Sequence, residues 1–345
     1  MPRTIGRKPF LPAFLSPPVL LAGVPSVGLL GYSAIVVPIA LVLGFVPLLI
    51  VAPVLWWMDR IEPEPWSERA HAFLWGAFVA GLTSLIVNSL VAGGTGSETI
   101  AAVVSAPLVE EATKALAIVW AARRKNIDGI MDGLVYAGWV ALGFAVVEDV
   151  AYFFLASEDD LLLETFVGRA LLTPFAHPLF TAWTGLAIGI AVRTRRPLWT
   201  AWWGLAMAVA THAAWNGALT LAEEDGSGTI MMIVAALVFV ALFIATIIAV
   251  IMLRRRDRKR LLILGPAIAE RYSLPPERVT TMLDHQLRRK SRNLLPKGER
   301  HAFDNEAGAV TRLTYLFDHD TAPDPADEAR LVSQLAAARH RGDQR

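Results

Sequence analysis

The chain has 345 residues, of which 54% are hydrophobic and only 18% charged, and its formal net charge is +1. Because soluble domains carry about 25% charged residues, this composition excludes an ordinary soluble protein and indicates a polytopic membrane protein. The near-neutral charge gives no reason to expect nucleic-acid binding, and the absence of cysteine excludes disulfides, thiolate metal sites and a cysteine nucleophile.

The N-terminal part is expected to enter the membrane after a short basic segment. Residues 1–18 form that segment, and the apolar stretch 19–58 follows it. One helical crossing takes about 20 residues, so this stretch predicts two helices with a break near residues 31–33, not a cleavable signal peptide. A polar connector with two Glu-Pro steps, 59–69, precedes the next span at 70–92.

The remaining apolar runs predict five further spans, each long enough for one crossing. They cover residues 99–122, 129–156, 166–192, 198–221 and 229–253. The predicted fold is therefore all-α, a polytopic transmembrane helical bundle of about eight spans over residues 19–253. A seven-span alternative, with one tilted helix in the N-terminal stretch, stays open.

The loops carry charge in a pattern that predicts their sidedness. Basic clusters at 123–125, 193–196 and 254–260 end every second span, whereas the loops at 157–164 and 222–228 are acidic. Because cytoplasmic loops are enriched in Lys and Arg, the basic ends are predicted to be cytoplasmic. An eight-span bundle would then place both termini in the cytoplasm.

The composition changes after the last span. Residues 254–345 are polar and charged, with leucines at helical spacing over parts of the segment. We expect a small helical cytoplasmic tail, with a linker or turn at 321–327. A solvated tail is favoured over a partner-binding one.

Two adjacent acids lie in the middle of the 99–122 span. Glu110 and Glu111 are followed one turn later by Lys114. Ionisable residues at mid-membrane depth cost about 2.5–3.5 kcal/mol each on insertion scales, so they are rare there and usually functional. Successive helical residues point about 100° apart, and Lys114 is placed to pair with either acid. A structural salt bridge between helices is the plain alternative.

The next three spans carry further polar groups at membrane depth. They are Glu148 and Asp149, then His177, then His212 with Asn216 one turn later. Since lipid cannot solvate such groups, they should face inward and meet the acids of the preceding span in one cavity in the outer half of the bilayer. Singly, a protonated carboxyl or a packing histidine would explain each residue. Asp149 is expected to point elsewhere and to be structural.

Carboxylates and imidazoles in a confined cavity form a ligand set typical of zinc, with an open position for water. Bound zinc lowers the pKa of that water to about 7, and a nearby Glu can carry its proton to a leaving amine. Asn216 could donate a hydrogen bond to a developing oxyanion. These residue types suit hydrolysis of a peptide bond by activated water.

Four motifs occur in order on successive spans. They are EEATK (Glu110 to Lys114), FAVVE (Phe144 to Glu148), a lone His177, and HAAWN (His212 to Asn216). Over residues 55–220 the chain resembles the PrsW-type intramembrane proteases, relatives of the CAAX prenyl protease and bacteriocin-processing superfamily. The resemblance implies a glutamate-dependent intramembrane endopeptidase, commonly treated as a metalloprotease, whose members can make the first cut in a membrane-bound anti-sigma factor. The CAAX branch has histidine where this chain has Glu148, so its ligand set does not transfer unchanged.

These observations lead to one predicted site and one predicted activity. We expect a plasma-membrane endopeptidase that cuts in or beside a membrane-spanning protein substrate, with Zn²⁺ as suspected cofactor. The predicted metal ligands are Glu148, His177 and His212, and the predicted catalytic residues are Glu110, Glu111 and Asn216.

Two other classes of protein are alternatives to an endopeptidase. A proton- or ion-coupled transporter could use the same residues as a relay, and a non-catalytic scaffold could hold them as structural pairs. A transporter of the inverted-repeat type should show a second matching set of polar residues in its other half. The polar residues here lie in four consecutive spans with no such counterpart, which favours a single buried site.

Overall fold

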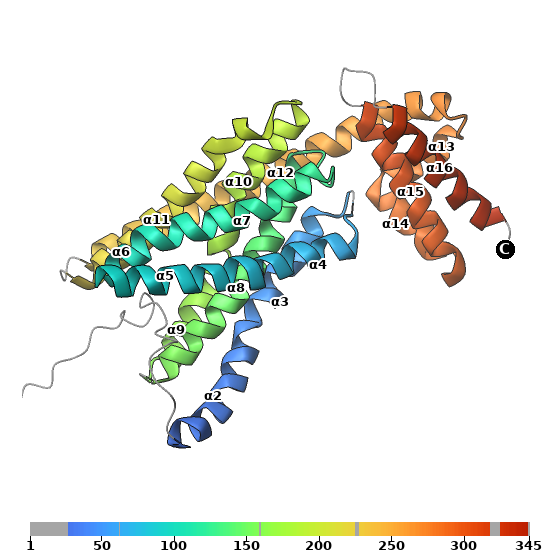
Figure 1. Cartoon of the computed structure of the whole chain (residues 1–345). Coiled ribbons are helices and arrows are strands. Elements are labelled where there is room, and N and C mark those ends of the chain that lie inside the picture. Colours follow the sequence, from blue (N-terminus) through green and yellow to red (C-terminus); the bar gives the residue numbers. More distant parts are fainter. Residues whose placement is uncertain (1–26, 62, 159, 225–227, 318–324, 344–345) are drawn as a thin grey trace, which may run out of the picture. The chain divides into compact units, whose positions relative to one another are not determined.

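A computed structural model describes residues 27–61, 63–158, 160–224, 228–317 and 325–343. Within these ranges every regular element is a helix and no strand occurs (Figure 1). The predicted N-terminal segment, 1–18, lies outside them. The chain divides into two compact units. We call the part up to Leu55 with Pro65–Thr246 the membrane unit, and Trp56–Glu64 with Ile247–Arg345 the C-terminal unit.

The membrane unit is built from long helices that change their winding at several points. In chain order they are α2 (Val27–Gly44), α3 (Val46–Met58), α4 (Trp66–Leu74), η1 (Trp75–Ala80), α5 (Gly81–Thr95), α6 (Glu98–Ile100), η2 (Ala101–Ser105), α7 (Ala106–Arg123), α8 (Ile130–Glu158), α9 (Leu162–Phe166), η3 (Val167–Leu172), α10 (Ala176–Arg193), η4 (Leu198–Ala201), α11 (Trp202–Glu224) and α12 (Gly228–Arg271). The segments η1, η2 and η3 are π-helical, a winding that is rare and often occurs at functional sites.

Helix α8 is the centre of the membrane unit, and 83% of its most apolar stretch is buried. Small residues let neighbouring helices approach it closely. A Cβ atom on Gly133 would lie 2.2 Å from the carbonyl oxygen of Gly185 on α10, and one on Gly143 would lie 1.9 Å from that of Phe73 on α4. Only glycine fits at either position, so these contacts fix the distance between the helices that carry the polar residues.

Five helices of the described residues are long and apolar enough to cross a membrane. They are Ile35–Met58, Trp66–Thr95, Ile130–Glu158, Leu162–Arg193 and Ile230–Arg271. The chain is thus an all-helical membrane protein, while the eight spans remain a prediction. The break predicted near residues 31–33 is wrong, because α2 continues to Gly44 and the interruption falls at Phe45. In an apolar setting the backbone keeps its own hydrogen bonds, so a Gly-Tyr-Ser sequence does not end a helix.

The C-terminal unit is a folded helical bundle with its own apolar core. It contains the end of α12 together with α13 (Pro276–Leu283), α14 (His285–Leu294), α15 (Lys297–Phe317) and α16 (Pro325–Asp343). Ile268, Met282 and Leu313 are at most 2% exposed at its centre. Arg288 donates to the carbonyl of Arg60 at 2.8 Å, which ties the connector after α3 to this unit. The predicted linker at 321–327 lies mostly outside the described residues.

Candidate functional site

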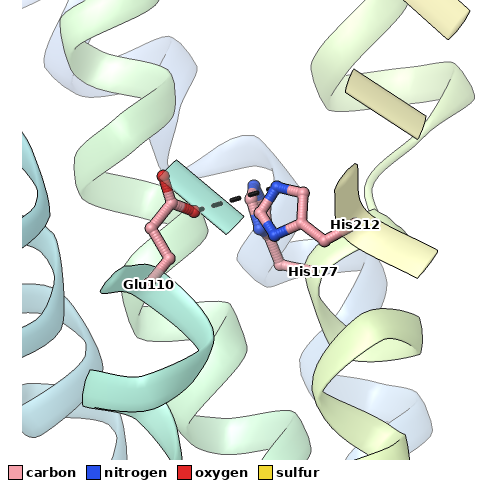
Figure 2. A group of neighbouring side chains, drawn as sticks. All are labelled: Glu110, His177 and His212. Atoms are coloured by element: carbon pink, nitrogen blue, oxygen red, sulfur yellow. Dashed lines mark ion pairs between the residues drawn. The ribbon is translucent and has the colours of Figure 1, made fainter. Parts of the chain in front are cut away.

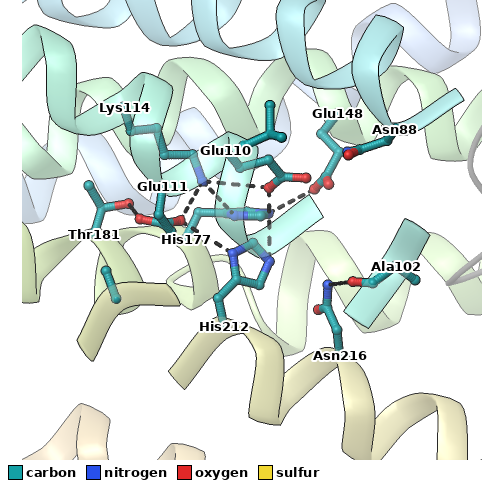
Figure 3. A network of polar contacts seen from close by, with 12 residues as sticks. Asn88, Ala102, Glu110, Glu111, Lys114, Glu148, His177, Thr181, His212 and Asn216 are labelled. Carbon is teal, nitrogen blue, oxygen red and sulfur yellow. Dashed lines mark hydrogen bonds and ion pairs between the residues drawn. The ribbon is translucent and has the colours of Figure 1, made fainter. Parts of the chain in front are cut away.

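The acids of α7 differ in how they are held, although they are adjacent in sequence. Glu111 is fully buried and bound from two sides: Lys114 Nζ lies 2.8 Å from its Oε1, and Thr181 Oγ1 donates to its Oε2 at 2.9 Å (Figure 3). Lys114 Nζ lies 3.8 Å from Glu110 Oε2 and 3.8 Å from the centre of the Phe144 ring. The sequence did not decide which of the two acids pairs with Lys114, and in the structure Glu111 makes the shorter contact.

Helix α11 directs His212 toward both acids. Its Nδ1 lies 3.3 Å from Glu111 Oε1 and its Nε2 lies 3.9 Å from Glu110 Oε2 (Figure 3). A neutral imidazole carries one proton, and only Nδ1 is within hydrogen-bond distance of a carboxylate, so we assign the proton to Nδ1 and a lone pair to Nε2, which faces Glu110. Glu110 Oε2 is buried and has no hydrogen-bond partner among the described residues. An acceptor thus faces an acceptor, and a cation or a donor between them would satisfy both.

His177 at the start of α10 has partners on both ring nitrogens. Lys114 Nζ lies 3.2 Å from its Nδ1, and Glu148 Oε2 lies 2.7 Å from its Nε2. An ammonium group only donates, so Nδ1 accepts from Lys114 and the ring proton on Nε2 goes to Glu148. The ring also packs edge-on against Phe144, with 4.9 Å between centroids.

A possible metal site arises where these side chains converge. One ligand atom from each of Glu110, His177 and His212 lies within 4.8 Å of the others, and all three residues are buried (Figure 2). Glu111 orients His212 through Nδ1, as carboxylates commonly do for metal-binding histidines. The donor set of one carboxylate and two imidazoles, with a Glu110 oxygen that makes no hydrogen bond to the described residues, fits a divalent metal such as zinc. The expected set had Glu148 in place of Glu110.

Arg169 joins the site from η3 and was not among the candidates from sequence. Its guanidinium binds Glu148 and lies 2.6 Å from Asp149 Oδ1, and it stacks 3.9 Å from the Tyr152 ring. Two adjacent acids at membrane depth need a cation, and Arg169 is a lone basic residue in the apolar stretch after the acidic loop. Two adjacent acids and one basic residue in nearby apolar stretches could therefore have predicted this pairing from the sequence. Asp149 is bound by this arginine and also lines the cavity, and its expected structural role stays a prediction.

Asn216 makes one hydrogen bond within the protein, and its predicted role as an oxyanion donor stays a prediction. Its Nδ2 donates to the carbonyl of Ala102 at 2.8 Å (Figure 3). Ala102 lies in the π-helical segment η2, where the altered hydrogen-bond pattern leaves a carbonyl open for a side chain. The amide of Asn216 therefore joins α11 to η2 with one of its two N–H donors, and Asn216 also lines the cavity described below.

A cavity of about 340 Å³ opens beside these residues, within the membrane unit. Its polar wall includes Glu110, Glu148, His177 and His212, and the rest of its lining is mostly apolar. Glu111 and Lys114 lie behind this wall and do not line the cavity. The arrangement places three carboxylates, those of Glu110, Glu148 and Asp149, and two imidazoles next to a space large enough for a short peptide segment.

Comparison with known proteins places the chain in a family. A family model described as "PrsW family intramembrane metalloprotease" matches residues 64–246, more than half of the chain. The chain belongs to this family. The cavity and the convergent side chains all fall inside the matched region, so the site described above is a site of the PrsW-family part of the molecule.

Two curated relatives share the name Protease PrsW. The protein from Clostridioides difficile (strain 630) is 34% identical over 152 residues, which is 41% of this chain and 63% of the relative. The protein from Geobacillus kaustophilus (strain HTA426) is 34% identical over 143 residues, which is 40% of this chain and 61% of the relative. The chain thus spans less than two thirds of these relatives. No solved structure matches it.

Membership of the PrsW family confirms the family predicted from the four sequence motifs and does not favour a transporter. The residues of those motifs lie together, with the α7 acids, His177 and His212 in contact. Their individual roles stay predictions, because contact alone does not assign chemistry.

Proposed function

We propose that this protein is an intramembrane endopeptidase that hydrolyses a peptide bond in or next to a membrane-spanning substrate. The observation that carries the proposal is the facing pair of acceptors, Glu110 Oε2 and His212 Nε2, 3.9 Å apart beside the cavity. Two buried acceptors that face each other are costly unless a cation or a donor binds between them, and Lys114 Nζ is 3.8 Å from Glu110 Oε2, beyond hydrogen-bond distance. The family and its relatives' names support a proteolytic use of that site.

We propose Glu110, His177 and His212 as the residues that would hold a metal ion, with zinc as the suspected ion. Glu110 thereby replaces the Glu148 expected from sequence. These residues would hold a zinc ion, which when bound would supply a Lewis acid to polarise a carbonyl and lower the pKa of water. For His177 to bind through Nε2, the ring proton shared with Glu148 must leave, so metal binding should release a proton there.

The other residues of the site have roles that follow from their contacts. Glu111 holds the His212 tautomer through Nδ1 and is itself fixed by Lys114 and Thr181. Glu148 lies on the cavity wall, where its carboxylate can take a proton from the attacking water and return it to the leaving amine nitrogen. Asn216 positions η2 through Ala102.

A cleavage assay in proteoliposomes tests the proposal. The full-length protein is reconstituted with a panel of single-pass membrane proteins that includes anti-sigma factors, and new termini are identified by mass spectrometry. Glu110→Gln and His212→Ala should lose at least 100-fold in rate, the order seen for loss of one essential catalytic group. Thr211→Val is the matched control, because Thr211 is next to His212 but bonds only within its own helix. Equal cleavage by wild type and both site variants would contradict the proposal.

We further propose a plasma-membrane location, with the basic ends of α7, α10 and α12 in the cytoplasm. The C-terminal unit supports this sidedness, because it joins the connector after α3 to the region after α12. An anti-sigma factor with one span is the proposed substrate. An eight-span topology with both termini inside would need a further crossing before α2, outside the described residues.

A further inference from the structure

Two polar side chains on α5 face the cavity and have no part in the chemistry above. Ser84 and Asn88 are four residues apart, so they share one face of the helix. They are 2% and 9% exposed, and both line the cavity that Glu110 and His212 line. Leu82 on the same helix is 46% exposed, on the outer side of the unit. Helix α5 thus turns its polar face inward, toward the site.

Both residues have unused capacity for hydrogen bonds. Ser105 Oγ donates to Asn88 Oδ1 at 2.8 Å, which fixes the amide and leaves Nδ2 without a protein acceptor among the described residues. Ser84 Oγ is buried and has no hydrogen-bond partner in the described part of the chain. Unsatisfied buried groups are few in folded proteins, and each one calls for a physical reason. This hydroxyl and the unused Asn88 donor line the same cavity, which indicates that something polar binds there.

The chemistry of the proposed reaction supplies a suitable occupant. In a membrane-spanning helix each peptide group is engaged in i→i−4 hydrogen bonds, so a scissile bond becomes accessible only when that segment unwinds. Unwound N–H and C=O groups in an apolar cavity need new partners. Four helical residues rise about 6 Å along α5. Two residues of an extended chain rise about 6.6–6.8 Å. The backbone groups of every second substrate residue are therefore spaced like Ser84 and Asn88.

We propose that Ser84 and Asn88 bind the backbone of an extended substrate segment beside the site. Asn88 Nδ2 donates to a substrate carbonyl, and Ser84 Oγ pairs with a backbone group two residues along. The inference rests on the proposed proteolytic function and adds a substrate class to it. Substrates should be spans with Gly or Pro near the cut, because such residues unwind a helix at low cost. Backbone contacts at these positions impose little side-chain selectivity.

A binding experiment tests this with defined probes. The full-length Glu110→Gln protein in proteoliposomes is titrated with two fluorescent Leu/Ala-rich membrane-spanning peptides, one with a Gly-Pro-Gly centre and one without it. Asn88→Leu and Ser84→Ala should each weaken binding of the Gly-Pro-Gly peptide by about 3–10-fold, the loss of one hydrogen bond. Thr83→Val, on the same helix but not on the cavity, should change nothing. None of these variants should affect the continuous peptide.

Ser84→Ala protects the test against misfolding, because Ser84 Oγ makes no hydrogen bond that folding would lose. In the active enzyme, both variants should raise KM by the same factor and change kcat less than twofold. Unchanged binding and KM in both variants would overturn the inference while leaving the proteolytic function intact. Weakened binding without any cleavage by the active chain would instead contradict the proteolytic function and leave the peptide site standing.

Discussion

Lys114 and Glu111 form an ion pair with no exposed side-chain surface, whereas Arg292 and Asp304 in the C-terminal unit form one with 40% of each side chain exposed. The two pairs have similar lengths, 2.8 Å in each case, but opposite energetics. An exposed pair forms at little cost and contributes about 0–1 kcal/mol. In a buried pair the attraction must first offset the large desolvation free energy of both charges. A protein in which apolar residues replace the pair is often as stable.

The membrane unit and the C-terminal unit use their charged residues differently. The C-terminal unit keeps an apolar core, and the arginines of its ion pairs stay about half exposed, as in Arg278 with Glu306 and Arg271 with Glu328. The membrane unit concentrates its buried charges around one cavity. The free energy lost by removing such charges from water can exceed what their attraction contributes to stability. We therefore propose that these charges are kept for chemistry, and the following variants test this.

Removing Lys114 should have the largest effect on stability. Lys114→Met leaves Glu111 as an uncompensated buried charge, and breaking such a pair costs about 3–5 kcal/mol. Reversible unfolding in mixed micelles would measure this, with Arg123→Met at the exposed end of α7 as the control. A loss under about 1 kcal/mol would show that the membrane unit tolerates Glu111 without its lysine. Buried and exposed ion pairs would then not differ in the way described above.

Removing Arg169 should cost less, since its side chain keeps 17% of its surface exposed. Arg169→Leu strands Glu148 and Asp149 together, and we expect a loss of about 2–3 kcal/mol, the size of one or two charged hydrogen bonds. The same unfolding assay applies. Cleavage should also fall, because Glu148 loses the group that fixes its carboxylate. Full stability with full activity would remove Arg169 from the site.

In the C-terminal unit, acid should loosen the region around His285. Partial burial and the nearby guanidinium groups of Arg60, Arg288 and Arg254 lower the pKa of His285 to about 4. The unfolded side chain titrates near 6.5, so between these values unfolding takes up a proton and stability falls as pH drops. Hydrogen exchange of α14 in the full chain, corrected for intrinsic rates, should show less protection at pH 5 than at pH 7.

His285→Gln provides the matched comparison for that pH effect. The glutamine can still accept from Arg60 Nε, which lies 3.1 Å from His285 Nε2, but it does not titrate. The loss of protection at pH 5 should therefore shrink in this variant and persist in His301→Gln. An identical pH response in His285→Gln would exclude the histidine as its source.

The smallest effect is expected at the exposed ion pair of α14 and α15. Arg292→Ala removes the bond to Asp304 and should change the free energy of unfolding by less than about 1 kcal/mol. High salt should have a similarly small effect there, because exposed charges are screened. A loss comparable to that of Lys114→Met would erase the distinction between the two regions.

The sequence predicted the members of the site better than their arrangement. Charged residues in apolar spans are conspicuous because of their cost, and this found the α7 acids, Glu148 and both histidines. Which acid binds Lys114 depends on the packing of α10 and α11, and spacing along one helix does not determine it. Asn88 and Ser84 were missed because neutral polar residues carry no comparable cost.

The helical class was predictable, and the boundaries were less so. The apolar runs gave the spans, but the break near residues 31–33 was inferred from polar and glycine residues that a membrane helix accommodates. Helix α12 continues past the predicted end at residue 253 to Arg271. The packing of the connector after α3 into the C-terminal unit joins segments about 190 residues apart or more, as Arg254 does with the carbonyl of Met58. Local pattern carries no signal for such a contact.

The central claim is that Glu110 and His212 hold a metal ion at the hydrolytic site. Metal analysis of the purified full-length protein, alongside its cleavage rate, tests it most directly. We predict about one zinc ion per chain in wild type and in Thr211→Val, with a large loss of both metal and cleavage in Glu110→Ala and His212→Ala. Wild-type protein that cleaves without metal, or a His212→Ala variant that retains full metal content, would contradict the account.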